Sequence, residues 1–237
     1  METVQQPIIT FYGPDGSGKS VIAHKASEIL NESGQPSFIL GSSDYPNWLT
    51  NEVCTRILGY NLPILDRLTR SEKTEFYEDL AIAGYLLSSE ISGAGRAVLI
   101  DSDPYLKRLI WAASTNPDSF LEYADNFEAK VCEAIGSSIF PDFVVVVETS
   151  ENNDSEVTFS RVVQRGVNTE YDPTSVEQSL AIHDASELVL NSIVLTRRYP
   201  RMENASVTTV QNFDIDKAQI DTALTQCANQ AMRRAGF

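Results

Sequence analysis

The segment Pro7 to Ser20 reads PIITFYGPDGSGKS and contains the pattern G-x-x-x-x-G-K-[ST] at residues 13–20. The apolar residues before Gly13 predict a β-strand, and those after Ser20 recur at helical spacing as far as Gly34. Glycines in the connecting loop allow backbone torsions that turn successive N–H groups toward a phosphate. The helix directs its positive end at the same anion. The segment therefore predicts a nucleotide-phosphate site.

The side chains of this loop suit different parts of a bound nucleotide. Lys19 offers a mobile positive charge to the β- and γ-phosphates of ATP, and the Ser20 hydroxyl is a ligand for Mg²⁺. Asp15 would repel a phosphate, so we assign its carboxylate to the hydroxyl group of an acceptor, with a solvent-facing position as the alternative. The residues expected to bind the nucleotide are Gly13, Asp15, Gly16, Ser17, Gly18, Lys19 and Ser20.

Composition narrows the class of protein. A chain of 237 residues with 42% hydrophobic and 22% charged residues fits one soluble α/β domain, expected over residues 1–237. The formal net charge of −15 opposes a nucleic-acid partner. We expect no membrane partner and a cytoplasmic location, because no apolar run approaches a membrane span and the first residues lack signal-peptide features. The three scattered cysteines indicate neither a disulfide framework nor a zinc site.

Short apolar segments alternate with amphipathic ones along the chain. This alternation predicts a parallel sheet with right-handed crossovers. Together with the phosphate-loop pattern at 13–20, it predicts the P-loop NTPase fold, an α/β fold with a five-stranded parallel sheet flanked by helices. Ligands of such sheets gather beyond the C-terminal ends of the strands. Besides the strand before Gly13 and the helix after it, we expect strands at 37–41, 97–100, 143–147 and 207–213, and helices at 51–58, 70–91 (with Ser71 as N-cap), from Pro104, 120–135, 157–164, 176–195 and 217–234.

Two carboxylates follow the strand at 97–100. Asp101 ends this strand, where a nucleotide-binding enzyme places a carboxylate close to Mg²⁺ or to the acceptor. Asp103 directly precedes Pro104, and this pair favours a helix cap. We therefore expect Ser20 and Asp101 to be the metal ligands, while Asp103 has a structural role.

Arg161 and Arg165 lie four residues apart on an expected helix and share one face. A polar segment follows, and we interpret residues 161–175 as a lid that closes over the phosphates and neutralises charge. A solvated arginine pair is the alternative. His24 and His183 have no metal-ligand spacing or nucleophilic partner and are assigned surface or packing roles. The expected catalytic residues are Lys19, Asp101, Arg161 and Arg165.

With these residues in place, the chain resembles the thymidylate kinase branch of the nucleoside monophosphate kinases. The resemblance implies ATP and Mg²⁺ as cofactors, a lid over the donor, and a nucleotide-sized acceptor near Asp15 and Asp101. It covers nearly the whole chain and rests on GPDGSGKS at 13–20, LID at 99–101, PDFVVVV at 141–147, RVVQRG at 161–166, and the strand and helix expected from Val207.

The chain departs from that family where arginines usually contact the acceptor phosphate. Ser102 follows the strand-end aspartate, residues 41–43 read Gly-Ser-Ser, and residues 81–88 contain no cation. Arg96 lies at the opposite end of its strand and cannot replace them. Each lost charge-assisted hydrogen bond is worth roughly 1.5–3 kcal/mol. We therefore expect dTMP to be a poor substrate.

The sequence supports an ATP-dependent kinase that acts on a small acceptor. The resemblance implies a nucleoside monophosphate, whereas the missing arginines favour an unphosphorylated nucleoside or another hydroxyl compound. A nucleotide-binding switch or a non-catalytic relative is the alternative of another class, although the chain has no N-K-x-D segment and retains Lys19 and Ser20. Lys107 and Arg108 are the cations nearest in sequence that could replace the missing arginines, but they lie in the first turns of a helix, where the helix dipole disfavours positive charge. The oligomeric state stays open, and a homodimer is compatible with the sequence.

Overall fold

The computed structural model describes residues 5–41, 49–64, 67–136, 139–148, 155–165 and 173–211, except for the side chains of Ser155, Arg165 and Gln211. Within these residues, five parallel strands form one sheet in the order β2-β3-β1-β4-β5. The predicted α/β fold with a five-stranded parallel sheet is confirmed. The strands are β1 (Ile8–Tyr12), β2 (Ser37–Leu40), β3 (Ala97–Ile100), β4 (Phe143–Glu148) and β5 (Ser206–Gln211).

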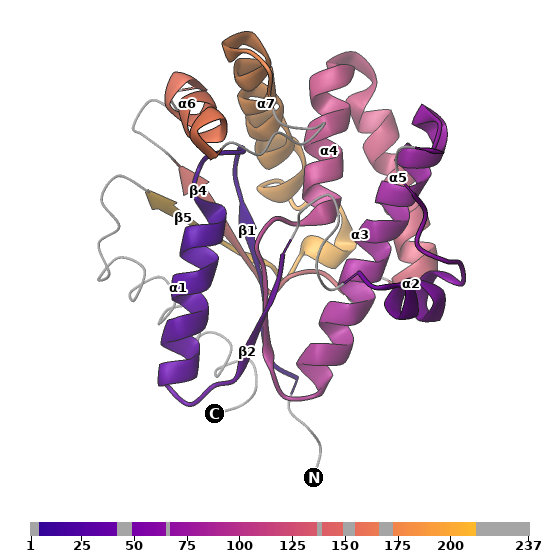
Figure 1. Ribbon diagram of the computed structural model, residues 1–237, viewed down its shortest axis with the longest axis vertical. Coiled ribbons are helices and arrows are strands. Elements are labelled where there is room, and N and C mark those ends of the chain that lie inside the picture. The colour runs from indigo at the N-terminus through magenta and orange to yellow at the C-terminus, as the bar shows by residue number, and fades with distance from the viewer. Residues whose placement is uncertain are drawn as a thin grey trace.

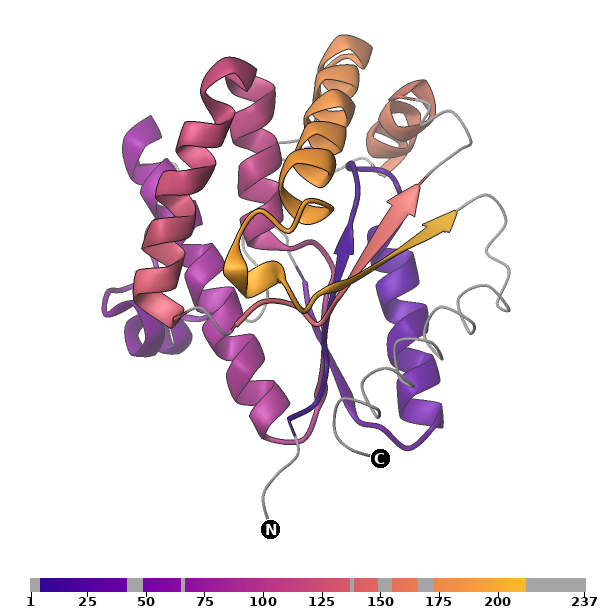
Figure 2. The same ribbon diagram turned by 180° about the vertical axis from the view of Figure 1, so that it is seen from behind.

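Helices cover both faces of the sheet (Figures 1 and 2). Helix α1 packs on one face, α3, α4, α5 and α7 lie on the other, and α6 lies beyond the C-terminal end of β4 (Figure 1). The helices are α1 (Lys19–Glu32), α2 (Asn51–Leu58), α3 (Arg70–Gly93), α4 (Pro104–Thr115), α5 (Phe120–Ile135), α6 (Ser155–Arg165) and α7 (Val176–Val189), with short turns η2 (Pro117–Ser119), η3 (Leu190–Val194) and η4 (Pro200–Met202).

The side chains of each strand contribute to two separate cores because successive side chains of a strand point to opposite faces of the sheet. In β1, Ile8 and Tyr12 join the core under α3, α4, α5 and α7, whereas Ile9 and Phe11 join the core under α1. Strands β3 and β4 alternate in the same way. This explains why strands β1 and β3 are buried throughout and almost entirely apolar: a sheet covered on both faces has no solvent-facing side.

Several expected boundaries shift by one or two residues in the structure, and the start of α3, the end of α7 and the bounds of β5 also differ. Helix α3 begins after Thr69, not Ser71, because Thr69 and Glu72 form a reciprocal capping box. The single helix expected over 176–195 ends at Val189 and continues as the π-helical turn η3. The last strand, expected over 207–213, is described as Ser206–Gln211, and the helix expected over 217–234 lies outside the described residues.

None of the described helices combines the length and the apolar composition that a bilayer crossing requires.

Candidate functional site

The loop between β1 and α1 is closely enclosed at two of its glycines. Gly13 has φ +150° and Gly16 has φ +84°, and both angles are uncommon for residues with a side chain. A Cβ atom on Gly13 would lie 2.5 Å from the Val147 carbonyl oxygen of β4, and one on Gly16 would lie 2.5 Å from the Thr158 carbonyl oxygen of α6. Glycine is therefore required by torsion and by space, and the loop fits between the end of β4 and α6.

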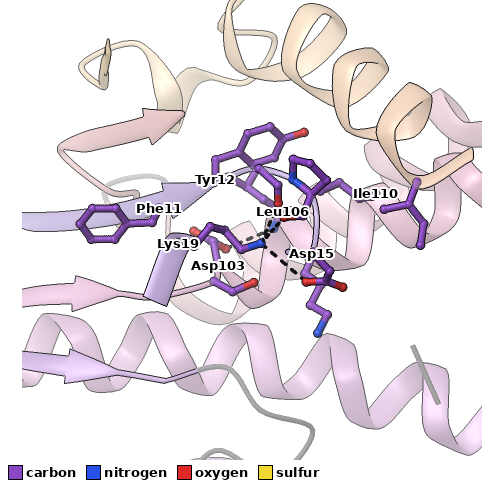
Figure 3. Close-up of a pocket in the computed structure, with 12 residues that line it drawn as sticks. Phe11, Tyr12, Asp15, Lys19, Asp103, Leu106 and Ile110 are labelled. Atoms are coloured by element: carbon purple, nitrogen blue, oxygen red, sulfur yellow. Dashed lines mark hydrogen bonds and ion pairs between the residues drawn. The ribbon is translucent and has the colours of Figure 1, made fainter. Parts of the chain in front are cut away.

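Lys19, the first residue of α1, is buried and held by the loop itself (Figure 3). Its Nζ atom donates to the carbonyl oxygens of Gly13 at 2.9 Å and Pro14 at 2.8 Å, and lies 3.6 Å from Oδ1 of Asp15. Burial lowers the pKa of Lys19 below its usual value; the Asp15 carboxylate opposes this shift, Lys107 adds to it, and Asp101 opposes it. The Lys19 ammonium group thus lies in a field set by three nearby charged groups.

A pocket opens between this loop, α4 and α7 (Figure 3). Its charged lining comes from the loop and from the first turn of α4, and its apolar lining comes from β1, α4 and α7. A cavity with a few converging charged groups on an apolar wall is typical of ligand sites. The lining residues are Phe11, Tyr12, Gly13, Pro14, Asp15, Lys19, Ser102, Asp103, Leu106, Lys107, Ile110 and Ile182.

Asp101 follows the last residue of β3, and its Oδ1 atom is buried with no hydrogen-bond partner among the described residues. A buried carboxylate oxygen without a donor suits a cation, and the Asp101 charge already acts on Lys19. Ser20 is exposed in the first turn of α1. These two oxygen donors fit Mg²⁺, which commonly takes one or two protein ligands and completes its shell with water and phosphate oxygens.

Asp103 caps α4, as its position before Pro104 predicts. Its Oδ1 atom accepts hydrogen bonds from the backbone N–H groups of Tyr105 at 2.9 Å and Leu106 at 3.2 Å. Its Oδ2 atom accepts one from the Tyr85 hydroxyl at 2.8 Å. Burial raises the pKa of Asp103 above its ordinary value, although these donors oppose the shift. Asp103 therefore fixes the start of α4 at the wall of the pocket.

A buried polar cluster extends behind Asp103 into the core. Arg201 donates from Nε to Glu128 Oε1 at 2.7 Å, and the Tyr105 hydroxyl donates to the other oxygen of Glu128, also at 2.7 Å. The Arg201 guanidinium lies 5.2 Å from the ring centroid of Tyr85, 4.3 Å from that of Tyr105 and 4.8 Å from that of Phe140. This cluster joins α3, α4, α5 and the η4 turn behind the pocket.

A second, smaller cavity lies between the ends of β2 and β3 and the helices α3 and α4. Its lining contains no Asp, Glu, Lys or Arg among the described residues. Ser102 lines both cavities, so the two approach each other at the end of β3. The lining residues of the smaller one are Leu40, Gly41, Gly84, Tyr85, Ile100, Ser102 and Pro104.

Helix α6 brings one of the two expected lid arginines to the loop. The exposed Arg161 donates from Nη1 to the Gly16 carbonyl oxygen at 3.3 Å. The side chain of Arg165 and residues 166–172 of the expected lid lie outside the described part of the chain.

Sequence reasoning missed that Thr158 Oγ1 lies 2.9 Å from Nε2 of His183 on α7. Thr158 and Val162 are both buried, and this i, i+4 pair was the available signal that one face of α6 packs on the protein.

The structure separates the two candidate replacement cations. Lys107 lines the pocket with Lys19, whereas Arg108 donates from Nε to the Tyr123 hydroxyl at 2.8 Å and stacks on Trp111. Arg96 donates to the backbone carbonyl of Ser37, the first residue of β2, so it lies at the opposite end of the sheet, as expected. Lys107 is therefore the cation that α4 presents to the pocket.

The fold and the phosphate loop define an α/β protein with the architecture of P-loop kinases. The solved structures that resemble it include deoxyadenosine kinase from M. mycoides with bound dCTP, at 16% identity and a TM-score of 0.55. The same enzyme with the products dCMP and a flexible dCDP bound matches at 14% identity with the same TM-score. Each match covers 94% of this chain and 99% of the other. No protein-family profile and no curated protein matches the sequence.

Proposed function

We propose that this protein is a P-loop kinase that transfers the γ-phosphoryl group of ATP to a hydroxyl group of a nucleoside-sized acceptor. The observation that carries the proposal is the buried Lys19 ammonium, which lies at the phosphate loop and lines a pocket together with the Asp15 carboxylate. The ammonium neutralises charge on the phosphates, and the carboxylate accepts a hydrogen bond from the hydroxyl. The likeness in fold to deoxyadenosine kinase supports an acceptor of this size.

The transfer itself is an in-line displacement at phosphorus. The bond between the γ-phosphorus and the bridging oxygen breaks, and its electron pair stays on ADP. A bond forms between phosphorus and the acceptor oxygen, and the hydroxyl proton passes to the Asp15 carboxylate. Mg²⁺, held by Ser20 and Asp101, supplies charge neutralisation on the phosphates when it is bound. Arg161 and Arg165 contribute further positive charge from the lid segment at 161–175, within one kinase unit that spans residues 1–237.

The smaller cavity favours a neutral acceptor over a nucleoside monophosphate. It adjoins the transfer site through Ser102, and its described lining is uncharged. A phosphate placed there would lose its water without gaining a cation, and burial of an unpaired charge is strongly unfavourable. We therefore propose an unphosphorylated nucleoside as the acceptor, or another hydroxyl compound of similar size, and dTMP as a poor substrate.

A coupled assay of ADP release across nucleosides, nucleoside monophosphates and non-nucleotide alcohols tests this function. We expect turnover with at least one neutral acceptor and little with dTMP. Lys19→Ala should lower kcat/KM by at least about 100-fold, roughly 3 kcal/mol of barrier. Lys25→Ala removes the same charge from a half-buried position on the same helix α1 and should stay within about twofold of the wild-type value.

Each other outcome points to a different conclusion. Efficient turnover of dTMP, with a KM in the low micromolar range, would restore a monophosphate acceptor. Slow ATP hydrolysis that no acceptor accelerates would favour the nucleotide-binding switch. Full activity of Lys19→Ala would overturn the phosphate-loop mechanism itself, and thermal melting of the variant shows separately whether the fold is intact.

A further inference from the structure

Two lysine side chains line the pocket beside the phosphate loop. Lys19 comes from the first turn of α1 and Lys107 from the first turn of α4. Burial is the main cause of the lowered pKa of Lys19, and the charge of Lys107 lowers it further. The two ammonium groups repel each other, and the carboxylates of Asp15 and Asp103 in the same lining oppose that repulsion, Asp15 at 3.6 Å from the Lys19 ammonium. A phosphoryl group in this pocket would therefore face one ammonium group from α1 and one from α4.

The packing of α4 determines that Lys107, and not Arg108, reaches this pocket. Consecutive residues of a helix point about 100° apart. Leu106, Lys107 and Ile110 all line this pocket and span an arc of about 100° on α4, with Ile110 between Leu106 and Lys107. Arg108 points toward α5, where it bonds to Tyr123. Of the two adjacent cations of α4, Lys107 therefore lines the pocket and Arg108 lies in the protein interior.

The stability of α4 does not account for a lysine at this position. A positive charge in the first turn of a helix opposes the helix dipole. The helix already has a complete N-cap in Asp103, whose carboxylate bonds to two backbone N–H groups and to Tyr85. The neighbouring lining residue Ser102 carries no charge. Lys107 therefore supplies the positive charge on the α4 side of the pocket.

We propose that Lys107 contacts the phosphoryl group during its transfer and supplies the charge that the chain lacks at Ser102. This inference rests on the proposed function. Lys107 forms and breaks no covalent bond; it bonds to the phosphoryl oxygens while the bond to ADP breaks and the bond to the acceptor forms. It does not line the smaller cavity, so it serves the transferred group rather than a phosphate of the acceptor.

Kinetics of four variants test this role with the best acceptor of the screen. Lys107→Ala should lower kcat by about 100-fold, the effect of removing one charge-stabilising donor, and should change the KM of the acceptor less than about threefold. Lys107→Arg should keep most of the activity. Lys107→Ala with Ser102→Arg should recover about tenfold, because the new guanidinium enters the same pocket. Lys25→Ala is the control for loss of one positive charge.

A binding measurement separates this inference from the proposed function. Lys107→Ala should weaken binding of ADP with aluminium fluoride, which mimics the transferred group, by at least about tenfold, and leave binding of ADP alone unchanged. Unchanged kcat and unchanged fluoride-dependent binding would overturn the role of Lys107 alone. If Lys107→Ala raised the KM only for phosphorylated acceptors, Lys107 would bind the acceptor phosphate, and this would also contradict its proposed contact with the transferred phosphoryl group. A wild-type protein with no turnover refutes the proposed function, whereas the binding measurement still tests Lys107.

Discussion

Replacing Gly16 with alanine should weaken both the fold and the activity, because two separate features of the structure exclude a Cβ atom there. Gly16 has φ +84°, where a residue with a side chain costs about 1–2 kcal/mol. The Cβ atom would also lie 2.5 Å from the Thr158 carbonyl oxygen. Ordinary contact begins at 3.4 Å, so the phosphate loop and α6 must move apart by about 0.9 Å. A displacement of about this size at a reacting centre lowers the rate roughly 100-fold.

Gly34→Ala is the matched control for this prediction. Gly34 has φ +83°, almost the same angle, but a Cβ atom there would meet nothing within 4 Å. In urea-induced unfolding both variants should lose the torsional contribution of about 1–2 kcal/mol, and Gly16→Ala should lose more. Only Gly16→Ala should lose about 100-fold in kcat. If the two variants show equal kcat and equal unfolding free energies, the contact between the phosphate loop and α6 is not tight and the reasoning fails.

Three further predictions concern buried charges and the lid. Arg201→Met should lower the unfolding free energy by about 3–5 kcal/mol because it leaves Glu128 buried and unpaired, and adding Glu128→Gln should recover part of this loss in urea unfolding. Burial raises the pKa of Asp103 above its ordinary value of 3.8. The protonated carboxyl group therefore contributes fully to folding stability below pH 3.8, and this contribution is lost as the pH rises from 3.8 through the raised pKa. The stability of the wild type relative to Asp103→Asn should fall over the same pH range. Arg161→Ala should lower kcat more than it raises the KM for ATP, and an effect on KM alone would assign Arg161 to binding.

The phosphate loop and the layers of the fold could be predicted because they depend on local patterns. The spacing from Gly13 to Ser20 and the apolar strands identify the β1–loop–α1 unit, and the structure shows the glycine torsions that this pattern requires. The N-cap of α3 could also have been predicted from the sequence. Thr69 is followed three residues later by Glu72, the capping-box spacing, whereas Ser71 lacks such a partner.

The identity of the pocket cation and of the buried arginine could not be predicted, because tertiary packing decides them. Lys107 and Arg108 are adjacent in one apolar run, and only the packing of α4 against α5 and α7 shows which side each faces. Arg201 stands in a segment with Arg197 and Arg198, and nothing local marks it as the buried one. Arg198 pairs with Asp125 at the surface, while Arg201 enters the core. The burial of His183 has the same origin.

The long sequence separation within the Arg201 cluster has a consequence during synthesis of the chain. Glu128 and Arg201 are 73 residues apart, so Glu128 leaves the ribosome well before its partner. At about 5–20 residues per second this interval lasts roughly 4–15 s. During that time α3, α4 and α5 cannot close around an ionised Glu128 without burying an unpaired charge. Completion of the core on this side of the sheet must therefore wait for the η4 turn, and nascent chains that stop short of Arg201 should stay open and sensitive to protease.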